Sequence, residues 1–271
     1  MVTCSVLSLF KNPSTRAETL SFRVEPNCQI IGSFNGLLCL YDYDGDFRLC
    51  NPSTRLTSKK SPHSFWSRQD ITHFGFGYDQ VKDKYKVLIA IRALNMTKVH
   101  TFGTNSWTTI QNPIFSESGD KEGKFVGGTM NWLNKRTGSY GNWAIVSFHM
   151  EKETYSEVLL PPKHDGGNKH VLDVLSNCLC FHYFDESHWV LWLMEKQESW
   201  TKLMLIPHNR ICNFRLFFHP LCISGNGDVL AKCLDPQLVL YNANKGTYNY
   251  PKLRGWFRPD MHIYHESLVS P

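Results

Sequence analysis

Several features that define common protein classes are missing from this sequence. No stretch reaches the ~18 uninterrupted apolar residues that a membrane-spanning helix needs. The N-terminal residues MVTCSVLSLFK lack the basic region of a secretory signal peptide. The basic residues are scattered, so the net charge of +5 is not gathered into a run that could follow a phosphate backbone. We therefore expect no membrane partner and no nucleic-acid partner.

The cysteines do not form a recognisable framework. Nine is an odd number, and no C-x-x-C pair occurs. In a chain without a signal peptide, such cysteines are typically reduced, buried and weakly polar. This use of cysteine indicates a cytoplasmic or nuclear protein.

The motifs of catalysis are also absent. There is no G-x-S-x-G nucleophile motif, and Gly75-x-Gly77 lacks the third glycine and the helix of a phosphate-binding loop. Asp173 and Asp228 lie beside turn signals, where aspartate is expected for turn formation. We predict no catalytic residue, no cofactor and no enzymatic activity.

One pattern of metal-ligand residue types needs separate consideration. Cys178, Cys180 and His182 alternate along a predicted strand, with Asp185 and His188 just beyond it. Alternate residues share one face, and cysteine and histidine are zinc ligands. On a single strand, however, such ligands are spread too far apart to surround one ion without help from elsewhere. Two buried thiols and a hydrogen-bonded histidine are the favoured interpretation, so no metal site is expected.

The apolar residues that are present come in short runs separated by Gly, Asn, Asp and Pro. Runs of this kind predict strands and tight turns, and the high aromatic content of 13% favours strands as well. Asp44-Gly45 and Asn226-Gly227 are typical hairpin turns. The sequence therefore predicts an all-β fold.

A repeat runs through these predicted strands. A hydroxyl residue followed by a large aromatic one recurs with the aromatics 48, 45 and 48 residues apart, at Ser106-Trp107, Thr154-Tyr155, Ser199-Trp200 and Thr247-Tyr248. A small or turn-forming residue opens an apolar strand in the first half of each unit, at Gly36, Gly75, Gly127-Gly128, Asn177 and Gly227. A period of this length with about four strands is typical of a β-propeller blade. We predict a propeller-like domain of about five to six four-stranded units, with a β-sandwich as the alternative.

The two ends of the chain are predicted to meet. His262–Val269 has the character of a strand and could pair with the opening strand Val2–Phe10. Such a pair would leave no sheet edge exposed.

Five longer motifs follow one another along the chain: IIGSFNGLLCL from Ile30, LCNPSTR from Leu49, FGFGYD from Phe74, GGTMNWL from Gly127 and YHESLVSP from Tyr264. In this order they resemble the F-box associated interaction domain of plant F-box/kelch-type proteins. It implies a kelch-like propeller that selects a protein for ubiquitination by an SCF ubiquitin ligase. In this family an N-terminal F-box docks on the adaptor subunit of the cullin complex.

The resemblance covers residues 30–271, which we assign to the interaction domain. Residues 1–29 are assigned to an N-terminal strand region that leaves no room for an F-box. The adaptor is therefore not expected to bind this chain directly. The chain would be a truncated relative, a fragment of a longer product, or a recognition domain that works without a docking half.

Protein binding is the function that these observations favour, with a partner of unknown identity. The longest irregular segments are 58–72, 111–124, 135–142, 161–170 and 206–217. Phe65, Trp66 and Arg68 in the first of them are of the types that dominate protein interfaces. Trp66 could instead pack on its own sheet. The alternative function is a propeller that binds a glycan or another small ligand.

Overall fold

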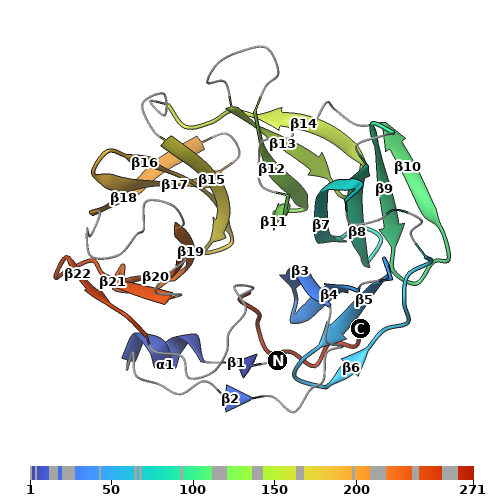
Figure 1. Cartoon of the computed structure of the whole chain (residues 1–271), viewed down its shortest axis with the longest axis horizontal. Helices are drawn as coiled ribbons and strands as arrows, with labels where there is room; N and C mark the ends of the chain where they lie inside the picture. The colour runs from blue at the N-terminus through green and yellow to red at the C-terminus, as the bar shows by residue number, and fades with distance from the viewer. Residues whose placement is uncertain are drawn as a thin grey trace. The chain divides into compact units, whose positions relative to one another are not determined.

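The structure is a computed structural model, and Figure 1 shows the whole chain as a cartoon. It describes residues 2–3, 5–11, 18–19, 28–42, 44–63, 66, 69–91, 94–111, 121–135, 143–162, 168–196, 199–207, 218–233, 238–251 and 262–271. The chain divides into two compact units. One unit comprises Met1–Arg23 and Pro161–Met261, and the other comprises Val24–Leu160 and His262–Pro271.

The described residues form five four-stranded antiparallel sheets in which strands adjacent in sequence are also adjacent in the sheet. The unit of Val24–Leu160 holds β3 (Gln29–Phe34), β4 (Leu37–Tyr41), β5 (Phe47–Asn51), β6 (Leu56–Thr57), β7 (Ile71–Asp79), β8 (Lys84–Ile91), β9 (Met96–Thr101), β10 (Trp107–Gln111), β11 (Lys124–Val126), β12 (Thr129–Lys135), β13 (Trp143–His149) and β14 (Thr154–Val158). The other unit holds β15 (Asn168–Leu175), β16 (Cys178–Asp185), β17 (His188–Lys196), β18 (Ser199–Pro207), β19 (Phe218–Ile223), β20 (Val229–Cys233), β21 (Leu238–Asn242) and β22 (Thr247–Asn249). The prediction of an all-β chain built from four-stranded units is confirmed.

Tight turns join the first two strands of several sheets. Asn35 and Gly36 connect β3 to β4 with φ angles of 50° and 77°, and Ser176 and Asn177 connect β15 to β16 with 53° and 61°. Positive φ at both central residues defines the type I′ turn, whose twist matches that of the paired strands. Asparagine and glycine favour this turn because they adopt positive φ at little cost.

The repeated hydroxyl–aromatic pair marks the start of the fourth strand in four sheets. Trp107, Tyr155, Trp200 and Tyr248 lie within the first two residues of β10, β14, β18 and β22. The interval of 45 to 48 residues is therefore the length of one sheet and its connections. The repeat predicted from the sequence is confirmed as the structural unit.

The fourth-strand aromatics also link neighbouring sheets. The Trp107 indole Nε1 donates a hydrogen bond of 3.0 Å to the carbonyl oxygen of Pro62, and its ring lies 5.8 Å from that of Phe47 on β5. The hydroxyl of Tyr155 lies 2.5 Å from Thr97 Oγ1 on β9. These contacts join the second and third sheets of the unit of Val24–Leu160 to the sheet that precedes each of them.

Gly75 does not occupy the position predicted for it. It lies inside β7, whereas Gly36, Gly128, Asn177 and Gly227 lie in the turns before second strands. A Cβ atom at Gly75 would lie 2.7 Å from the Met130 side chain on β12. The glycine is therefore required for close packing between two sheets and not for a turn.

The predicted strand pair between the chain ends is wrong. β1 (Val2–Thr3) pairs with β2 (Glu18–Thr19), and α1 (Val6–Lys11) follows β1 as a helix. Leu9 of α1 is buried against Leu230, Leu238 and Leu240 on β20 and β21. The apolar residues of the N-terminal segment thus cover a sheet as a short helix. No helix among the described residues is long and apolar enough to cross a membrane.

Residues 262–271 contain no strand but are bound to the first sheet of their unit. The Asn51 side-chain amide donates to the carbonyl oxygens of Ser267 at 3.0 Å and Val269 at 2.7 Å. The Ser267 hydroxyl donates to the carbonyl oxygen of Asn35 at 3.0 Å. A Cβ atom at Gly36 would lie 2.1 Å from Ser267 Oγ. Side-chain hydrogen bonds therefore replace the strand pairing that the sequence suggested.

Candidate functional site

Asp173 is the centre of a buried polar cluster in the unit of Pro161–Met261. It lies within β15 opposite Cys180 of β16, and its side chain is 9% exposed. An aspartate is seldom buried unless it is paired. The prediction that Asp173 serves a turn is wrong. Asp228 does lie at a turn, where its Oδ1 accepts a hydrogen bond from the Ala243 amide.

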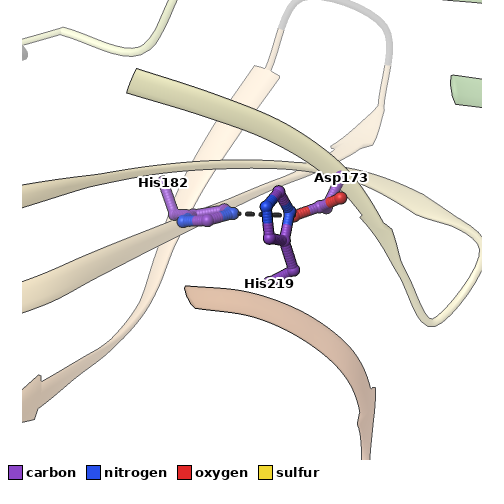
Figure 2. Close-up of side chains that lie close together, drawn as sticks. All are labelled: Asp173, His182 and His219. Carbon is purple, nitrogen blue, oxygen red and sulfur yellow. Dashed lines mark hydrogen bonds and ion pairs between the residues drawn. The ribbon is translucent and has the colours of Figure 1, made fainter. Parts of the chain in front are cut away.

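Two histidines from different sheets meet the Asp173 carboxylate. His182 Nε2 on β16 and His219 Nδ1 on β19 each lie 2.9 Å from Asp173 Oδ2, as Figure 2 shows. The His182 side chain is fully buried, whereas that of His219 is 21% exposed. The imidazole planes are 86° apart, with centroids 6.2 Å from each other. The carboxylate thus bridges the sheets β15–β18 and β19–β22, and the cluster is open to solvent on the His219 side.

The metal-ligand pattern identified in the sequence is largely not assembled in space. Of Cys178, Cys180, His182, Asp185 and His188, only His182 belongs to the cluster. Burial raises the pKa of Cys180 well above its ordinary value, with the charge of Asp173 contributing, so this thiol remains protonated. Asp185 and His188 lie at the β16–β17 turn, where Asp185 Oδ1 accepts from the His188 amide at 2.9 Å.

Sequence reasoning missed the other two members of the cluster. His219 stands in the apolar run Phe217–Leu221, and Asp173 stands between Leu172 and Val174. A polar residue inside a buried strand needs a partner, which is the signal that could have selected both. Their pairing depends on contact between two sheets and cannot be read from spacing along one strand.

Proton sharing and metal coordination are both open to this cluster. The two imidazole nitrogens and the carboxylate oxygen all lie within 4.8 Å of one another. Imidazole and carboxylate are both ligands of divalent transition metals.

A second buried polar cluster lies in the other unit. Lys86 on β8 and Asp79 on β7 both have fully buried side chains, and the Lys86 Nζ lies 2.8 Å from Asp79 Oδ2. The same ammonium group donates to Glu153 Oε1 and to the Met150 carbonyl oxygen, each at 2.7 Å. The ammonium group thus joins the β7–β8 hairpin to the turn between β13 and β14. Among the described residues, Asp79, Glu153 and the Met150 carbonyl oxygen surround this ammonium group.

Of the three residues predicted to bind a protein partner, Trp66 alone lies among the described residues. Phe65 and Arg68 lie outside the described residues. Trp66 is partly buried against the core of the first two sheets, and Lys98 Nζ lies 5.2 Å from the centroid of its ring. Packing and a cation–π contact therefore hold the Trp66 ring in place. Most of the predicted binding segments after residue 110 also lie outside the described residues.

The described residues define an all-β protein built from five four-stranded antiparallel sheets. A family model described as the F-box associated beta propeller domain matches residues 3–255. The chain therefore belongs to the F-box associated beta propeller domain family, as the motifs had indicated.

Relatives from Arabidopsis thaliana carry F-box names. An F-box/kelch-repeat protein is 28% identical over 261 residues, covering 90% of this chain and 69% of that protein. The F-box protein CPR1 is 27% identical over 251 residues, covering 79% of this chain and 61% of its own length. The chain thus spans about two thirds of these relatives. A solved extracellular domain of a one-component system from B. thetaiotaomicron aligns at 12% identity with a TM-score of 0.42, over 86% of this chain and 29% of that one. That score is too low to support an argument.

Proposed function

We propose that this chain is a protein-recognition domain that selects a target for ubiquitination by an SCF-type cullin ligase. The observation that carries the proposal is membership of the F-box associated beta propeller family, together with relatives named as F-box proteins. In proteins of that kind the F-box contacts the ligase adaptor, which leaves target selection to the associated domain.

The buried polar groups of the described residues support binding rather than catalysis. Burial raises the pKa of the Cys39 thiol and of the Cys180 thiol well above the ordinary value, which makes both poor nucleophiles. Lys86 is neutralised by internal carboxylates. We assign no catalytic residue and no enzymatic activity to this chain.

The state of the cysteines supports a location in the cytoplasm or nucleus. The seven cysteines among the described residues are all free, and four of them are buried. Free thiols persist in reducing compartments, where ubiquitin ligases of this type also act.

The segment around Trp66 is assigned to the contact with the target protein, together with Phe65 and Arg68. The contacts of Trp66 support this assignment, because a ring that is held before binding loses little side-chain entropy on binding. Tryptophan and arginine are also the residue types that most often dominate the energy of an interface.

A fusion protein tests the proposal without requiring an F-box in this chain. The F-box of the Arabidopsis F-box/kelch relative would be joined to the N-terminus of the chain and expressed in plant cells treated with a proteasome inhibitor. Ubiquitin-remnant peptides would then be compared with those from cells that express the F-box alone. We expect a small, reproducible set of proteins to gain ubiquitin only with the fusion. Identical ubiquitination in both samples would contradict a recognition role.

A further inference from the structure

We propose that Asp173, His182 and His219 together bind one Zn²⁺ ion. This site goes beyond protein recognition and does not depend on it. Its three ligand atoms come from β15, β16 and β19, and all of them lie within 4.8 Å of one another. Figure 2 shows both imidazole rings directed at the same carboxylate.

The distances within the cluster suit a tetrahedral ion. Zinc binds imidazole nitrogen and carboxylate oxygen at about 2.0–2.2 Å, so neighbouring ligand atoms of a tetrahedron lie about 3.3 Å apart. Each histidine nitrogen already lies 2.9 Å from Asp173 Oδ2. Each of these two distances would have to lengthen by about 0.4 Å, and the distance between the two imidazole nitrogens, which is within 4.8 Å, would have to become about 3.3 Å as well.

The placement of the ligands on two sheets suits the ion as well. The planes of the His182 and His219 rings are 86° apart, and His219 lies on another sheet than Asp173 and His182. Three ligands on one strand are spread along it, whereas here the third comes from another sheet. That difference separates this set from Cys178, Cys180 and His182, which share one strand.

The ligand types favour zinc over magnesium or calcium. Two imidazoles and one carboxylate are borderline donors, whereas magnesium and calcium prefer oxygen ligands throughout. Three protein ligands leave a fourth position for water. Because the His219 side chain is 21% exposed, water can reach the cluster from that side.

Zinc binding exchanges hydrogen bonds for coordinate bonds. In the hydrogen-bonded cluster each histidine presents an N–H group to Asp173. In the zinc complex the same nitrogens present lone pairs, and each neutral ring carries its proton on the other nitrogen. The ion would then join the sheets β15–β18 and β19–β22 more strongly than the shared carboxylate does. Because the unfolded chain cannot assemble the site, zinc binding stabilises the folded protein.

The test is a zinc titration of the full chain without a histidine tag, after treatment with a chelator. We expect one Zn²⁺ per chain by calorimetry. At a free zinc concentration ~100-fold above Kd, the thermal midpoint should rise by roughly 5–10 °C. Cobalt replaces zinc in the parallel experiment and should give the visible absorption of a four-coordinate complex.

Two variants and one control locate the ion. His219→Ala removes the partly exposed ligand, and Asp173→Asn replaces the carboxylate by an amide of the same shape. Each should weaken zinc binding at least ~10-fold, since even residues behind the ligands contribute that much. His188→Ala removes a histidine of the same unit outside the cluster and should bind zinc like the wild type.

The outcomes are decisive for this site. Absence of stoichiometric zinc binding by the folded wild type would overturn the proposal. Equal binding by the wild type and a folded ligand variant would overturn it too. If a variant does not fold, the cobalt spectrum of the wild type decides: a six-coordinate, water-like spectrum contradicts the site and a four-coordinate spectrum supports it.

Discussion

Lys86→Met is the substitution with the most sharply defined effect in this chain. It removes an ammonium group that is fully buried, 2.8 Å from Asp79 and 2.7 Å from both Glu153 and the Met150 carbonyl oxygen. Methionine retains most of the aliphatic volume, so the loss is chiefly electrostatic. The Asp79 carboxylate keeps the amides of Val81 and Lys82 as hydrogen-bond donors.

The expected cost follows from the charge that remains buried. Removing one partner of a buried ion pair typically costs 3–5 kcal/mol. Because two backbone amides still satisfy Asp79, we expect a loss near the lower limit, about 3 kcal/mol. Urea denaturation measures this difference in the free energy of unfolding. Lys82→Met is the matched control: its Nζ is 4.0 Å from Asp79 and its side chain is 56% exposed, so its loss should stay below ~1 kcal/mol.

The stabilisation by Lys86 should also depend on pH. Burial opposes ionisation of Asp79, but the ion pair with Lys86 and the backbone donors hold its pKa below the ordinary value. Burial likewise opposes the charge of Lys86, yet Asp79 and Glu153 raise its pKa. A lowered carboxylate pKa stabilises the fold above its ordinary value of ~3.9, and a raised lysine pKa stabilises it below ~10.4.

The stability gap between wild type and Lys86→Met should therefore be nearly constant from about pH 5 to pH 9 and shrink as the pH falls below ~4. Above ~10.4 the gap should also shrink once the pH passes the raised pKa of Lys86. A Lys86→Met protein within ~0.5 kcal/mol of the wild type at neutral pH would refute the reasoning. A loss equal to that of Lys82→Met would refute it as well.

Three further substitutions or measurements test other parts of the fold. Asn51→Ala removes two hydrogen bonds to the C-terminal segment and two that Asn51 Oδ1 accepts from the Ser53 and Thr54 amides, and should cost about 2–4 kcal/mol. Limited proteolysis should then cut within residues 262–271 more readily, and unchanged protection would contradict the contact. Gly75→Ala places a Cβ 2.7 Å from Met130 and should cost about 1–3 kcal/mol in urea denaturation. Because Met130→Ala removes the clashing side chain, the double variant should lose less stability than the sum of the two single losses; strict additivity would show that the two residues do not touch. Burial raises the pKa of the Cys39 and Cys180 thiols. Iodoacetamide at pH ~8 should therefore alkylate these two thiols about 100-fold more slowly in the folded than in the unfolded protein. Equal alkylation rates would contradict their burial.

The repeat could be predicted because it depends on residues that act locally, within one sheet. Turn residues such as Asn35 and Gly36 and the fourth-strand aromatics act within one sheet, and their spacing along the chain equals the spacing of the sheets. The sequence predicts that Gly75 opens an apolar strand, whereas it lies inside β7, because a glycine followed by an apolar run has the same pattern before a strand and within one. Only the contact with Met130, which belongs to another sheet, reveals its function.

The polar cluster could not be predicted as a whole, because it too depends on contact between two sheets. The sequence identifies His182 as a candidate metal ligand because it alternates with two cysteines on one strand. Asp173 meets His182 from the neighbouring strand of the same sheet, and His219 joins them through contact between sheets, 46 residues after Asp173 in the chain. The N-terminal helix is another such case: Leu9 is buried by β20 and β21, which lie more than two hundred residues later in the sequence. Contacts of this range leave no periodic signal in a single sequence.

The most direct test of the central claim is a binding titration between the purified chain and the protein that the F-box fusion ubiquitinates most strongly. A protein-recognition domain predicts direct one-to-one binding with a Kd of ~10 μM or tighter. It also predicts binding at least ~10-fold weaker for Trp66→Ala, if the segment around Trp66 forms the contact. Absence of binding at about 100 μM would contradict the account, because such a protein would have gained ubiquitin without being recognised by this chain.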